Sequence, residues 1–424
     1  MSDTGAGVTR AFVLHPDILS DRNRRDANAG LDEAVSLAVA LPELEVVGSS
    51  TVRVQKPQPG YLFGSGKIDE LKDLFKSLEV DLVLIDGPVT PVQQRNLEKA
   101  WGAKLLDRTG LILEIFSDRA RTREGVLQVE MAALSYQRTR LVRAWTHLER
   151  QRGGLGFVGG PGETQIEADR RAIDEQLVRL RRQLSKVVKT RELHRKARAK
   201  VPYPIVALVG YTNAGKSTLF NRLTGAEVMA KDMLFATLDP TMRGVKLPDG
   251  PEVILSDTVG FISDLPTELV AAFRATLEEV LAADLILHVR DISHEQSDEQ
   301  ADDVNAILDS LGVDEDRPMF EVWNKIDQLP DDALDELTLI AQSDPNVSMV
   351  SAITGEGLDG LLEEITLRLE GKKSDVSFVL RYSEGRKRAW LFDQGVVEEE
   401  VQDEHGFNLR VRWTAKQEKR FRDL

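Results

Sequence analysis

The residues with the most explicit chemistry form a glycine-rich turn between a strand and a helix. The segment GYTNAGKS, from Gly210 to Ser217, follows the apolar run IVALV and precedes the apolar-periodic TLFNRL. Its spacing, G-x-x-x-x-G-K-S, is typical of a phosphate-binding loop, in which backbone N–H groups and the helix N-terminus stabilise phosphate charge. We expect Lys216 to reach the β- and γ-phosphates and the Ser217 hydroxyl to ligate Mg²⁺. The sequence therefore predicts a site for a nucleoside triphosphate.

Groups that would complete a magnesium–triphosphate site follow in two later segments. VILSDTVG ends a strand at Asp257, which can hold Mg²⁺ through water, and Gly260 offers an N–H to the γ-phosphate. The intervening LFATLDPT contains Thr237 and Thr241, and from chemistry alone either hydroxyl could complete the Mg²⁺ shell. We therefore predict a metal site made of Ser217, Asp257 and one of these threonines.

The choice of base is predicted from the NKID segment, which follows the strand-like MFEVW. The Asp327 carboxylate can accept from both the N1–H and the exocyclic amine of guanine, and adenine has no such donor pair, so GTP is expected rather than ATP. Asn324 can bond the base and brace the phosphate loop, while the Lys325 stem packs on the purine. Backbone groups of the later SAI segment can meet guanine O6. The predicted GTP-binding residues are Gly210, Tyr211, Thr212, Asn213, Ala214, Gly215, Lys216, Ser217, Thr218, Phe235, Ala236, Thr237, Leu238, Asp239, Asp257, Thr258, Val259, Gly260, Asn324, Lys325, Ile326, Asp327, Ser351, Ala352 and Ile353.

The surrounding elements predict an α/β protein. Residues 1–118 alternate strand signals (AFVL, LEVVGSSTVRVQ, DLVLID) with helix signals (GLDEAVSLAVAL, SGKIDELKDLF, PVQQRNLEKAW), which indicates an α/β domain with a largely parallel sheet. Residues 203–370 are predicted to form the P-loop GTPase domain, again with a mainly parallel sheet. Residues 371–424 predict a short C-terminal α+β segment that contains the strand-like LRVRW.

Residues 119–202 are predicted to form an antiparallel helical hairpin. Apolar residues recur at heptad-like spacing on both sides of GGLGFVGGPGE, Gly153 to Glu163, which is too glycine-rich for either a helix or a strand. From Arg170 to Lys200 there are twelve Lys or Arg residues against three acidic ones. Two interpretations stay open, namely a solvated helix face and an arm that contacts RNA phosphates.

The composition of the 424-residue chain limits the function classes. The formal net charge is −15 and the pI is near 5.1, so the average surface is acidic and any affinity for RNA must come from a local patch. The absence of cysteine excludes disulfides and Cys-based metal sites. The chain has no apolar run of about 18 residues and no leader-like N-terminus, so no membrane span is expected. We expect a cytoplasmic monomer.

Taken together, these segments resemble the HflX family of translation-associated GTPases. The similarity is carried by PGYLFGSGKIDEL from Pro59, by DRTGLILEIFSDRARTREGVLQVEMAAL from Asp107, by GGPGETQIEADRR from Gly159, and by GYTNAGKSTLFNRL and FATLDPT. The resemblance implies that Thr237, rather than Thr241, supplies the magnesium hydroxyl. It also implies a GTPase that binds the large ribosomal subunit and its rRNA, takes GTP and GDP as ligands, and splits or rescues stalled or idle ribosomes.

The resemblance further implies membership of the GTPases that carry an apolar residue in place of the catalytic glutamine, here Phe261. A phenyl ring cannot hydrogen-bond water, so intrinsic hydrolysis is expected to be slow. Two substitutes are conceivable: a K⁺ ion that Asn213 holds beside the phosphates, or ordering of the loops around Thr237 and Gly260 by the ribosome. The predicted catalytic residues are therefore Lys216, Thr237, Gly260 and Asn213, with Mg²⁺ as cofactor and K⁺ as a candidate second cation.

Three other functions remain open at this point. A ribosome-assembly GTPase would need the same basic arm, and a regulatory switch would bind a protein partner instead of RNA. An ATP-dependent RNA-unwinding enzyme would bind ATP, and GSGK, from Gly64 to Lys67, is a candidate second site. Its spacing differs from that of a phosphate-binding loop and suits the start of a helix.

Overall fold

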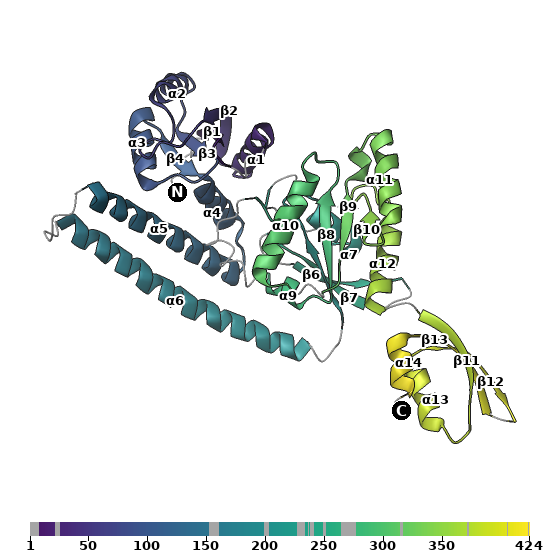
Figure 1. Cartoon of the computed structure of the whole chain (residues 1–424). Coiled ribbons are helices and arrows are strands. Elements are labelled where there is room, and N and C mark those ends of the chain that lie inside the picture. Colours follow the sequence, from purple (N-terminus) through teal and green to yellow (C-terminus); the bar gives the residue numbers. More distant parts are fainter. Residues whose placement is uncertain are drawn as a thin grey trace, which may run out of the picture.

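The computed structural model describes residues 8–21, 26–151, 161–198, 203–226, 234–235, 237, 241–248, 252–263, 277–313, 317–370, 373–404, 406–422 and 424. Four parts follow one another along the chain (Figure 1): an N-terminal α/β unit, a long helical hairpin, a second α/β unit, and a small sheet with two helices. This arrangement confirms the α/β fold class predicted from the sequence.

The N-terminal unit is built on a four-stranded sheet with the order β2-β1-β3-β4, in which every neighbouring pair is parallel, as predicted. Its elements are β1 (Thr9–Ile18), α1 (Ala27–Val39), β2 (Leu44–Val54), α2 (Ser65–Ser77), β3 (Leu82–Ile85), α3 (Pro91–Trp101), β4 (Lys104–Asp107) and α4 (Arg108–Arg119). Helix α3 shows how local sequence sets an element. Thr90 and Gln93 form a capping box, Pro91 occupies the first turn, and Gly102 ends the helix in the left-handed region.

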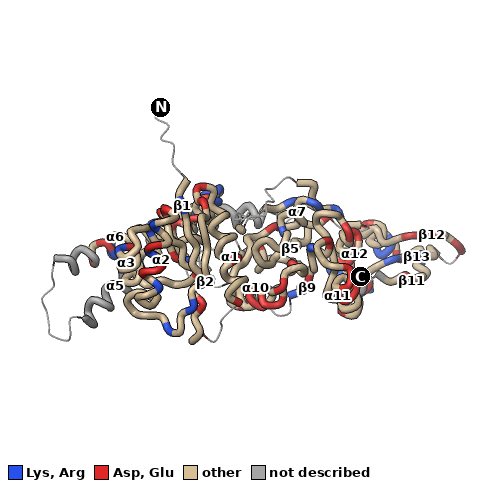
Figure 2. The backbone as a smooth tube through the Cα atoms, turned by 90° about the horizontal axis from the view of Figure 1, so that it is seen from above, with Lys and Arg blue, Asp and Glu red and all other residues tan. Residues whose placement is uncertain are grey.

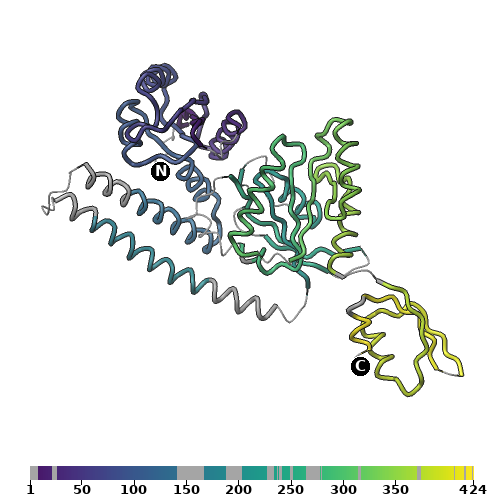
Figure 3. The backbone as a smooth tube through the Cα atoms, in the orientation of Figure 1, coloured from purple at the N-terminus to yellow at the C-terminus, as the bar shows by residue number. Residues whose placement is uncertain are grey.

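The sequence pattern does not predict β4 and α4. The strand KLLD has only four residues. Helix α4 buries consecutive side chains, including Leu111, Ile112 and Leu113, so it lacks the one-sided apolar stripe that reveals an amphipathic helix. The backbone trace explains this burial, because α4 lies where the N-terminal sheet, the hairpin and the second α/β unit meet (Figure 3).

The hairpin consists of α5 (Arg123–Gln151) and α6 (Pro161–Arg198), which run antiparallel, as predicted (Figure 1). Leu177 and Leu180 of α6 are buried, and the Arg138 guanidinium pairs with Asp174 across the two helices at 2.7 Å. The expectation that all of residues 153–163 stay outside helices is wrong at the end of that stretch. Helix α6 begins at Pro161, because proline fits the first helical turn. No helix among the described residues combines the length and apolar character that a membrane span needs.

The second α/β unit has a six-stranded sheet with the order β10-β9-β8-β5-β7-β6, and all its pairs are parallel except β6 with β7. Central strands β5 and β8 are buried on both faces, which is typical of parallel sheets covered by helices, and β8 buries His288 and Arg290 among its apolar residues. The strands are β5 (Ile205–Val209), β6 (Thr241–Lys246), β7 (Glu252–Asp257), β8 (Leu285–Asp291), β9 (Met319–Asn324) and β10 (Val347–Met349), and the helices include α7 (Lys216–Thr224), α9 (Glu278–Ala282), α10 (Ser297–Leu311), η1 (Ile326–Gln328), α11 (Asp331–Ser343) and α12 (Leu358–Glu370).

The C-terminal part is an antiparallel sheet with the order β11-β13-β12 and two helices. It has its own small core, which includes Leu391, Val411 and Trp413. Its elements are β11 (Lys373–Leu380), α13 (Gly385–Asp393), β12 (Val397–Asp403), β13 (Gly406–Thr414) and α14 (Ala415–Arg422). The predicted strand LRVRW lies within β13. Acidic residues gather over β12 here and over α10 and α12 of the second unit (Figure 2).

One hydrophobic core runs across the boundary between the two α/β units. Ile115 and Phe116 of α4 belong to the same buried cluster as Phe235 and Phe261 of the second unit. The rings of Phe116 and Phe235 meet edge to face, with centroids 4.6 Å apart. The N-terminal unit is therefore packed onto the segments that follow β5 and β7.

Candidate nucleotide site

The glycine-rich turn lies where β5 ends, at the carboxyl edge of the parallel sheet, and α/β proteins place ligands at this edge. Helix α7 begins at Lys216, directly after the turn, so its N-terminal N–H groups face the same space. A cavity of about 310 Å³ opens here. It is lined by Thr212, Asn213, Gly215, Lys216, Ser217, Thr218, Phe235, Thr237, Thr258, Gly260, Asn324, Lys325, Asp327, Gln328, Ala352 and Ile353.

The backbone of the turn has a shape that only particular residues allow. Gly215 has a φ of 91° and Asn213 a φ of 62°, both in the left-handed region. A Cβ atom on Gly215 would lie 2.1 Å from Nδ2 of Asn324, so a side chain at this position would clash. A turn of this shape can direct its N–H groups toward a bound anion, and Asn324 packs closely against Gly215.

Lys216 is buried within the turn. Its Nζ donates to the carbonyl oxygens of Gly210 at 3.0 Å and of Tyr211 at 2.7 Å. Burial lowers the pKa of Lys216 to about 8, and the charge of Asp257 opposes this shift. A phosphate group in the cavity would favour the charged ammonium, so this side chain is poised for an anionic ligand.

Three oxygen-bearing side chains converge beside Lys216. The Ser217 hydroxyl donates to Oδ2 of Asp257 at 2.7 Å, and the Thr237 hydroxyl donates to the same oxygen at 3.0 Å. The two hydroxyl oxygens are 2.8 Å apart. Thr241, the alternative, instead begins β6, where it pairs in register with Asp257. The structure thus brings Thr237 to Ser217 and Asp257.

This cluster fits a small divalent cation. Oδ1 of Asp257 is buried and has no hydrogen-bond partner among the described residues. Burial raises the pKa of Asp257, although hydrogen bonds from Ser217 and Thr237 and the charge of Lys216 oppose the shift. A cation would satisfy the orphaned oxygen and stabilise the ionised carboxylate, and hydroxyl and carboxylate oxygens are the ligands that Mg²⁺ takes.

Gly260 and Phe261 pack against the phosphate loop. A Cβ atom on Gly260 would lie 2.9 Å from Cα of Thr212 and 3.1 Å from Nζ of Lys216, so only glycine lets the phosphate loop approach this closely. The Phe261 backbone N–H donates to Gly210 at 3.1 Å, and its carbonyl accepts from Thr212 at 2.7 Å. The Phe261 side chain is 1% exposed. Phe261 is therefore held as a core residue and does not face the cavity.

Asn324 joins the two ends of the site. It ends β9, and its Nδ2 donates to the carbonyl of Ala214 in the phosphate loop at 2.9 Å. Its Oδ1 accepts from the backbone N–H of Ala352 at 3.0 Å. One buried amide therefore fixes the phosphate loop relative to the loop after β10.

Asp327 and Lys325 are held by neighbours on either side of the cavity. Oδ1 of Asp327 accepts from the Ser351 hydroxyl at 2.6 Å. Lys325 has a φ of 67°, and its Nζ pairs with Asp291 at 2.7 Å. Both side chains line the cavity together with the exposed Ile353. The arrangement presents a carboxylate, an aliphatic stem and backbone groups to a planar ligand.

The predicted residues divide into three groups, and the first consists of the fifteen that line the cavity described above. Ala236, Leu238 and Asp239 lie outside the described residues. Gln328 lines the cavity and was not predicted, although it directly follows NKID and closes η1. Seven predicted residues are not among those that line the cavity: Gly210, Tyr211, Ala214, Asp257, Val259, Ile326 and Ser351.

Family models match the chain in four consecutive stretches. Residues 28–117 match a model described as GTP-binding GTPase N-terminal, and residues 119–198 match GTP-binding GTPase Middle Region. Residues 205–325 match 50S ribosome-binding GTPase, and residues 336–422 match HflX C-terminal domain.

Individual proteins are similar over nearly the whole chain. A GTPase HflX from Magnetococcus marinus is 50% identical over 92% of this chain and 88% of its own length. A GTPase HflX from Escherichia coli is 44% identical over 95% of this chain and 93% of its own. A solved GTP-binding protein from Sulfolobus solfataricus in complex with GDP is 22% identical, with a TM-score of 0.44, over 85% of this chain and 98% of that one.

Proposed function

The chain belongs to the HflX family of GTPases, and from this premise we propose that it binds the large ribosomal subunit in its GTP-bound form and uses GTP binding and hydrolysis to split or rescue stalled or idle ribosomes. The enzyme activity is the hydrolysis of GTP to GDP and phosphate. The large subunit as partner is supported by the model matched by residues 205–325, which is described as a 50S ribosome-binding GTPase.

The observation that carries this proposal is a phosphate end and a base end joined in one cavity by Asn324. With the triphosphate over the turn at Lys216, the guanine would lie beside Asp327, whose carboxylate accepts from N1–H and the exocyclic amine. The Ser351 hydroxyl already occupies one lobe of that carboxylate and fixes its plane. The Lys325 stem would cover one face of the base, and the backbone at Ala352 would meet O6.

Mg²⁺ would be held by Ser217 and Thr237, and by Asp257 through water, and it would offset charge on the β- and γ-phosphates. The chain's own groups have two further tasks. The Lys216 ammonium neutralises the γ-phosphate, and the Gly260 N–H donates to it, so both favour the charge distribution of the transition state. Loss of the γ-phosphate would release the segments that contain Thr237 and Gly260.

The attacking water needs a group other than Phe261. We propose that Asn213, whose side chain lines the phosphate end of the cavity, supports a K⁺ ion, and that the bound ribosome orders the loops around Thr237 and Gly260. GTP turnover should then rise when K⁺ replaces Na⁺ and rise again with added large subunits. If neither change alters the rate of GTP turnover, both the K⁺ ion and the ordering by the ribosome are ruled out as the missing catalytic element.

The hairpin supplies the proposed contact with rRNA. Arg179, Arg182 and Lys186 are exposed on α6, within the segment where basic residues outnumber acidic ones twelve to three. Such a patch binds phosphates even though the whole chain is acidic. We propose that residues 1–118, 119–202, 203–370 and 371–424 act as separate functional parts, and that the protein works as a monomer in the cytoplasm, where its ribosomal partner is found.

Sedimentation of purified ribosomes with the full-length protein tests the proposal. Mature ribosomes should separate into subunits with GTP or a non-hydrolysable analogue and stay intact with GDP, and the protein should comigrate with the large subunit. Intact ribosomes in every lane, with binding confined to immature particles, would instead favour a ribosome-assembly GTPase. Competition with ATP adds a second criterion, because an RNA-unwinding enzyme driven by ATP would not prefer GTP.

A further inference from the structure

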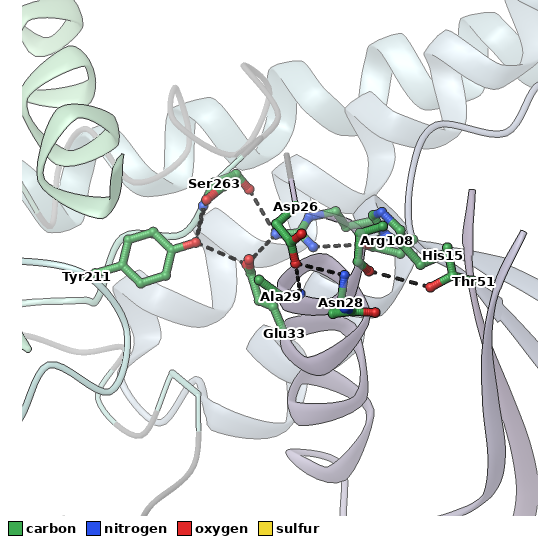
Figure 4. Close-up of polar contacts among 11 residues, drawn as sticks. His15, Asp26, Asn28, Ala29, Glu33, Thr51, Arg108, Tyr211 and Ser263 are labelled. Carbon is green, nitrogen blue, oxygen red and sulfur yellow. Dashed lines mark hydrogen bonds and ion pairs between the residues drawn. The ribbon is translucent and has the colours of Figure 1, made fainter. Parts of the chain in front are cut away.

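A buried polar network connects the N-terminal α/β unit to the phosphate loop and to the segment after Gly260 (Figure 4). Two of its members come from the N-terminal unit: Glu33 of α1, and Arg108, the first residue of α4. The other two come from the nucleotide unit: Tyr211, which follows Gly210 in the phosphate loop, and Ser263. The four side chains point toward one another in Figure 4.

Tyr211 is anchored at its phenolic oxygen. The hydroxyl donates to Oε1 of Glu33 at 3.1 Å and accepts from the backbone N–H of Ser263 at 2.9 Å, and it also contacts the Ser263 hydroxyl. The residue is 5% exposed. Because the ring is rigid, these contacts fix the position of the Tyr211 backbone, whose carbonyl holds Nζ of Lys216.

Arg108 holds the other side of the network. Its Nη2 donates to Oε1 of Glu33 at 2.6 Å and to the carbonyl oxygen of Ser263 at 3.0 Å, and its Nη1 donates to Oδ1 of Asp86 at 2.6 Å. Asp86 is in turn paired with Nδ1 of His15 at 2.7 Å. A planar guanidinium that bridges three acceptors in this way defines their relative positions closely.

Asp86 and Arg108 stabilise each other's ionised forms. Burial alone would raise the pKa of Asp86, but Arg108 and His15 more than compensate, and the pKa lies below its ordinary value. Burial alone would lower the pKa of Arg108, but Asp86 and Glu33 raise it above the ordinary value. The contact is therefore made by hydrogen bonds between ionised groups.

Both anchored points lie next to groups that act on the γ-phosphate. Ser263 is three residues beyond Gly260, and the intervening Phe261 is hydrogen-bonded to the phosphate loop. A second contact from the N-terminal unit reaches the segment that contains Thr237, since Phe116 packs on Phe235, two residues before Thr237. The N-terminal unit thus touches both segments that the γ-phosphate would order.

We propose that Glu33 and Arg108 are positioning residues for GTP hydrolysis, which hold Tyr211 and Ser263 so that Lys216 and the Gly260 N–H meet the γ-phosphate, resting on the GTP site proposed above. By linkage, a triphosphate that tightens these segments also tightens the contact with the N-terminal unit, and GDP does so less. The strength of the contact between the N-terminal unit and the nucleotide unit would therefore depend on which nucleotide is bound.

The test compares full-length variants by steady-state phosphate release and by GDP affinity. Tyr211→Phe removes one oxygen, Glu33→Ala removes the acceptor, and Glu33→Gln keeps an amide oxygen that can still accept from Tyr211 and Arg108. We expect kcat to fall by about 10- to 100-fold in Tyr211→Phe and Glu33→Ala, as for other small displacements of catalytic groups. GDP affinity should stay within about twofold, and Glu33→Gln should recover most of kcat.

The matched control is Arg140→Lys. Arg140 likewise joins an N-terminal carboxylate, Asp107, to another part of the chain, but that part is the hairpin. The Arg140→Lys variant should leave kcat unchanged. Arg108→Lys is a harsher variant, because an ammonium cannot bridge Glu33, Asp86 and the Ser263 carbonyl as the guanidinium does. Tyr211→Phe therefore decides the question if Arg108→Lys does not fold.

Hydrogen exchange gives a readout that a merely structural role would not move. In the wild type, amides of α1 and α4 should exchange more slowly with a non-hydrolysable GTP analogue than with GDP, and Tyr211→Phe should abolish the difference. Folded variants with an unchanged or raised kcat would overturn the positioning role. A wild-type chain that binds neither GTP nor GDP would refute the nucleotide assignment itself, and the positioning role with it.

Discussion

Phe261 illustrates how one residue can occupy a catalytic position without a catalytic group. Its backbone extends the pairing between the phosphate loop and the segment after β7, and its ring is sealed in the core that both α/β units share. A polar side chain here would have to be buried without a partner or swing out and break this packing. The residue therefore stabilises the site, and the water must be oriented from elsewhere.

Asp327 should determine the choice of base. Replacement of Asp327 by Asn presents an amide N–H₂ to the guanine donors, so one or two hydrogen bonds to a charged acceptor are lost. Such bonds contribute about 1.5–3 kcal/mol each, so GTP affinity should fall by roughly 10- to 100-fold or more. Xanthosine triphosphate, which offers a carbonyl in place of the amine, should bind the variant better than GTP does.

Competition binding with a fluorescent GTP analogue checks this expectation. Asp332→Asn is the matched control, because Asp332 is an exposed acid in the first turn of α11 and does not line the cavity. Equal GTP affinity in the two variants would contradict the assigned pose of the base.

Lys216 should couple GTP binding to proton uptake. Burial lowers its pKa from 10.5 to about 8 in the nucleotide-free protein, so between these values the unfolded chain holds a proton that the folded protein lacks. Stability of the nucleotide-free protein therefore rises with pH across this window, and it is lost as the pH falls toward 8. Bound phosphates favour the ammonium, so Mg–GTP binding should take up as much as one proton near pH 9 and less near pH 7. Calorimetry in buffers of different ionisation enthalpy measures this number, and an equal proton count at both pH values would refute it.

At the scale of elements, β8 carries a buried histidine that should make the second unit acid-sensitive. Burial, together with the charges of Arg290 and Lys216, lowers the pKa of His288 to about 4, although the charge of Glu321 opposes this shift. The unfolded value is near 6.5, so the folded-state pKa is the depressed one. The stability contributed by neutral His288 is complete above about pH 6.5 and is lost as the pH falls toward 4, with a loss of about 2 kcal/mol at pH 5.

Urea unfolding at pH 7 and pH 5 measures that loss. The His288→Gln variant should be less stable at pH 7 and show a smaller decrease on acidification. His294→Gln changes an exposed histidine just beyond the same strand and should keep the wild-type decrease. A wild-type decrease retained in His288→Gln would show that other groups cause it.

The elements also show what the sequence can and cannot predict. Strands and helices with one clear period, such as β2, α2 and α3, are predicted because their local patterns are unambiguous. Helix α4 is missed because its burial on several sides follows from contacts made by other parts of the chain. The glycine-rich stretch ends earlier than predicted because Pro161 can begin a helix even among glycines.

The nucleotide site likewise has parts that the sequence predicts and parts that it does not. The phosphate loop, the segment that ends at Asp257, and NKID are short contiguous motifs, so the sequence alone predicts their chemistry. Glu33 lies 178 positions from Tyr211, and Arg108 lies 155 positions from Ser263. A lone Glu in α1 and a lone Arg at a helix start resemble ordinary surface residues, and only folding brings them to the nucleotide.

At the scale of the whole molecule, the basic arm should account for binding to the ribosome. The double variant Arg179→Glu, Arg182→Glu reverses two exposed charges on α6. It should weaken binding to the large subunit by about tenfold or more at low salt, because fewer phosphates are neutralised and fewer counterions are released on binding. The variant should also show a shallower decrease in affinity with added KCl. Cosedimentation across a salt series measures both quantities.

The control reverses charges elsewhere on the molecule. Arg386→Glu with Arg420→Glu changes two exposed arginines of the C-terminal part and keeps the same net charge as the arm variant. Binding that is reduced equally in both variants would mean that overall charge, rather than the arm, attracts the ribosome. Unchanged binding in the arm variant would remove the arm from the mechanism.

The shared core between the two α/β units has a practical consequence for anyone who wishes to dissect this chain. Excision of the nucleotide unit would expose Phe235 and the Tyr211 ring, which Phe116 and Glu33 cover in the full chain. The fragment would then carry an exposed apolar surface and would tend to self-associate. The N-terminal fragment would expose the complementary face. When the two fragments are co-expressed, they should associate through these faces. The boundary between the two α/β units is therefore a suitable place to split the chain for fragment complementation.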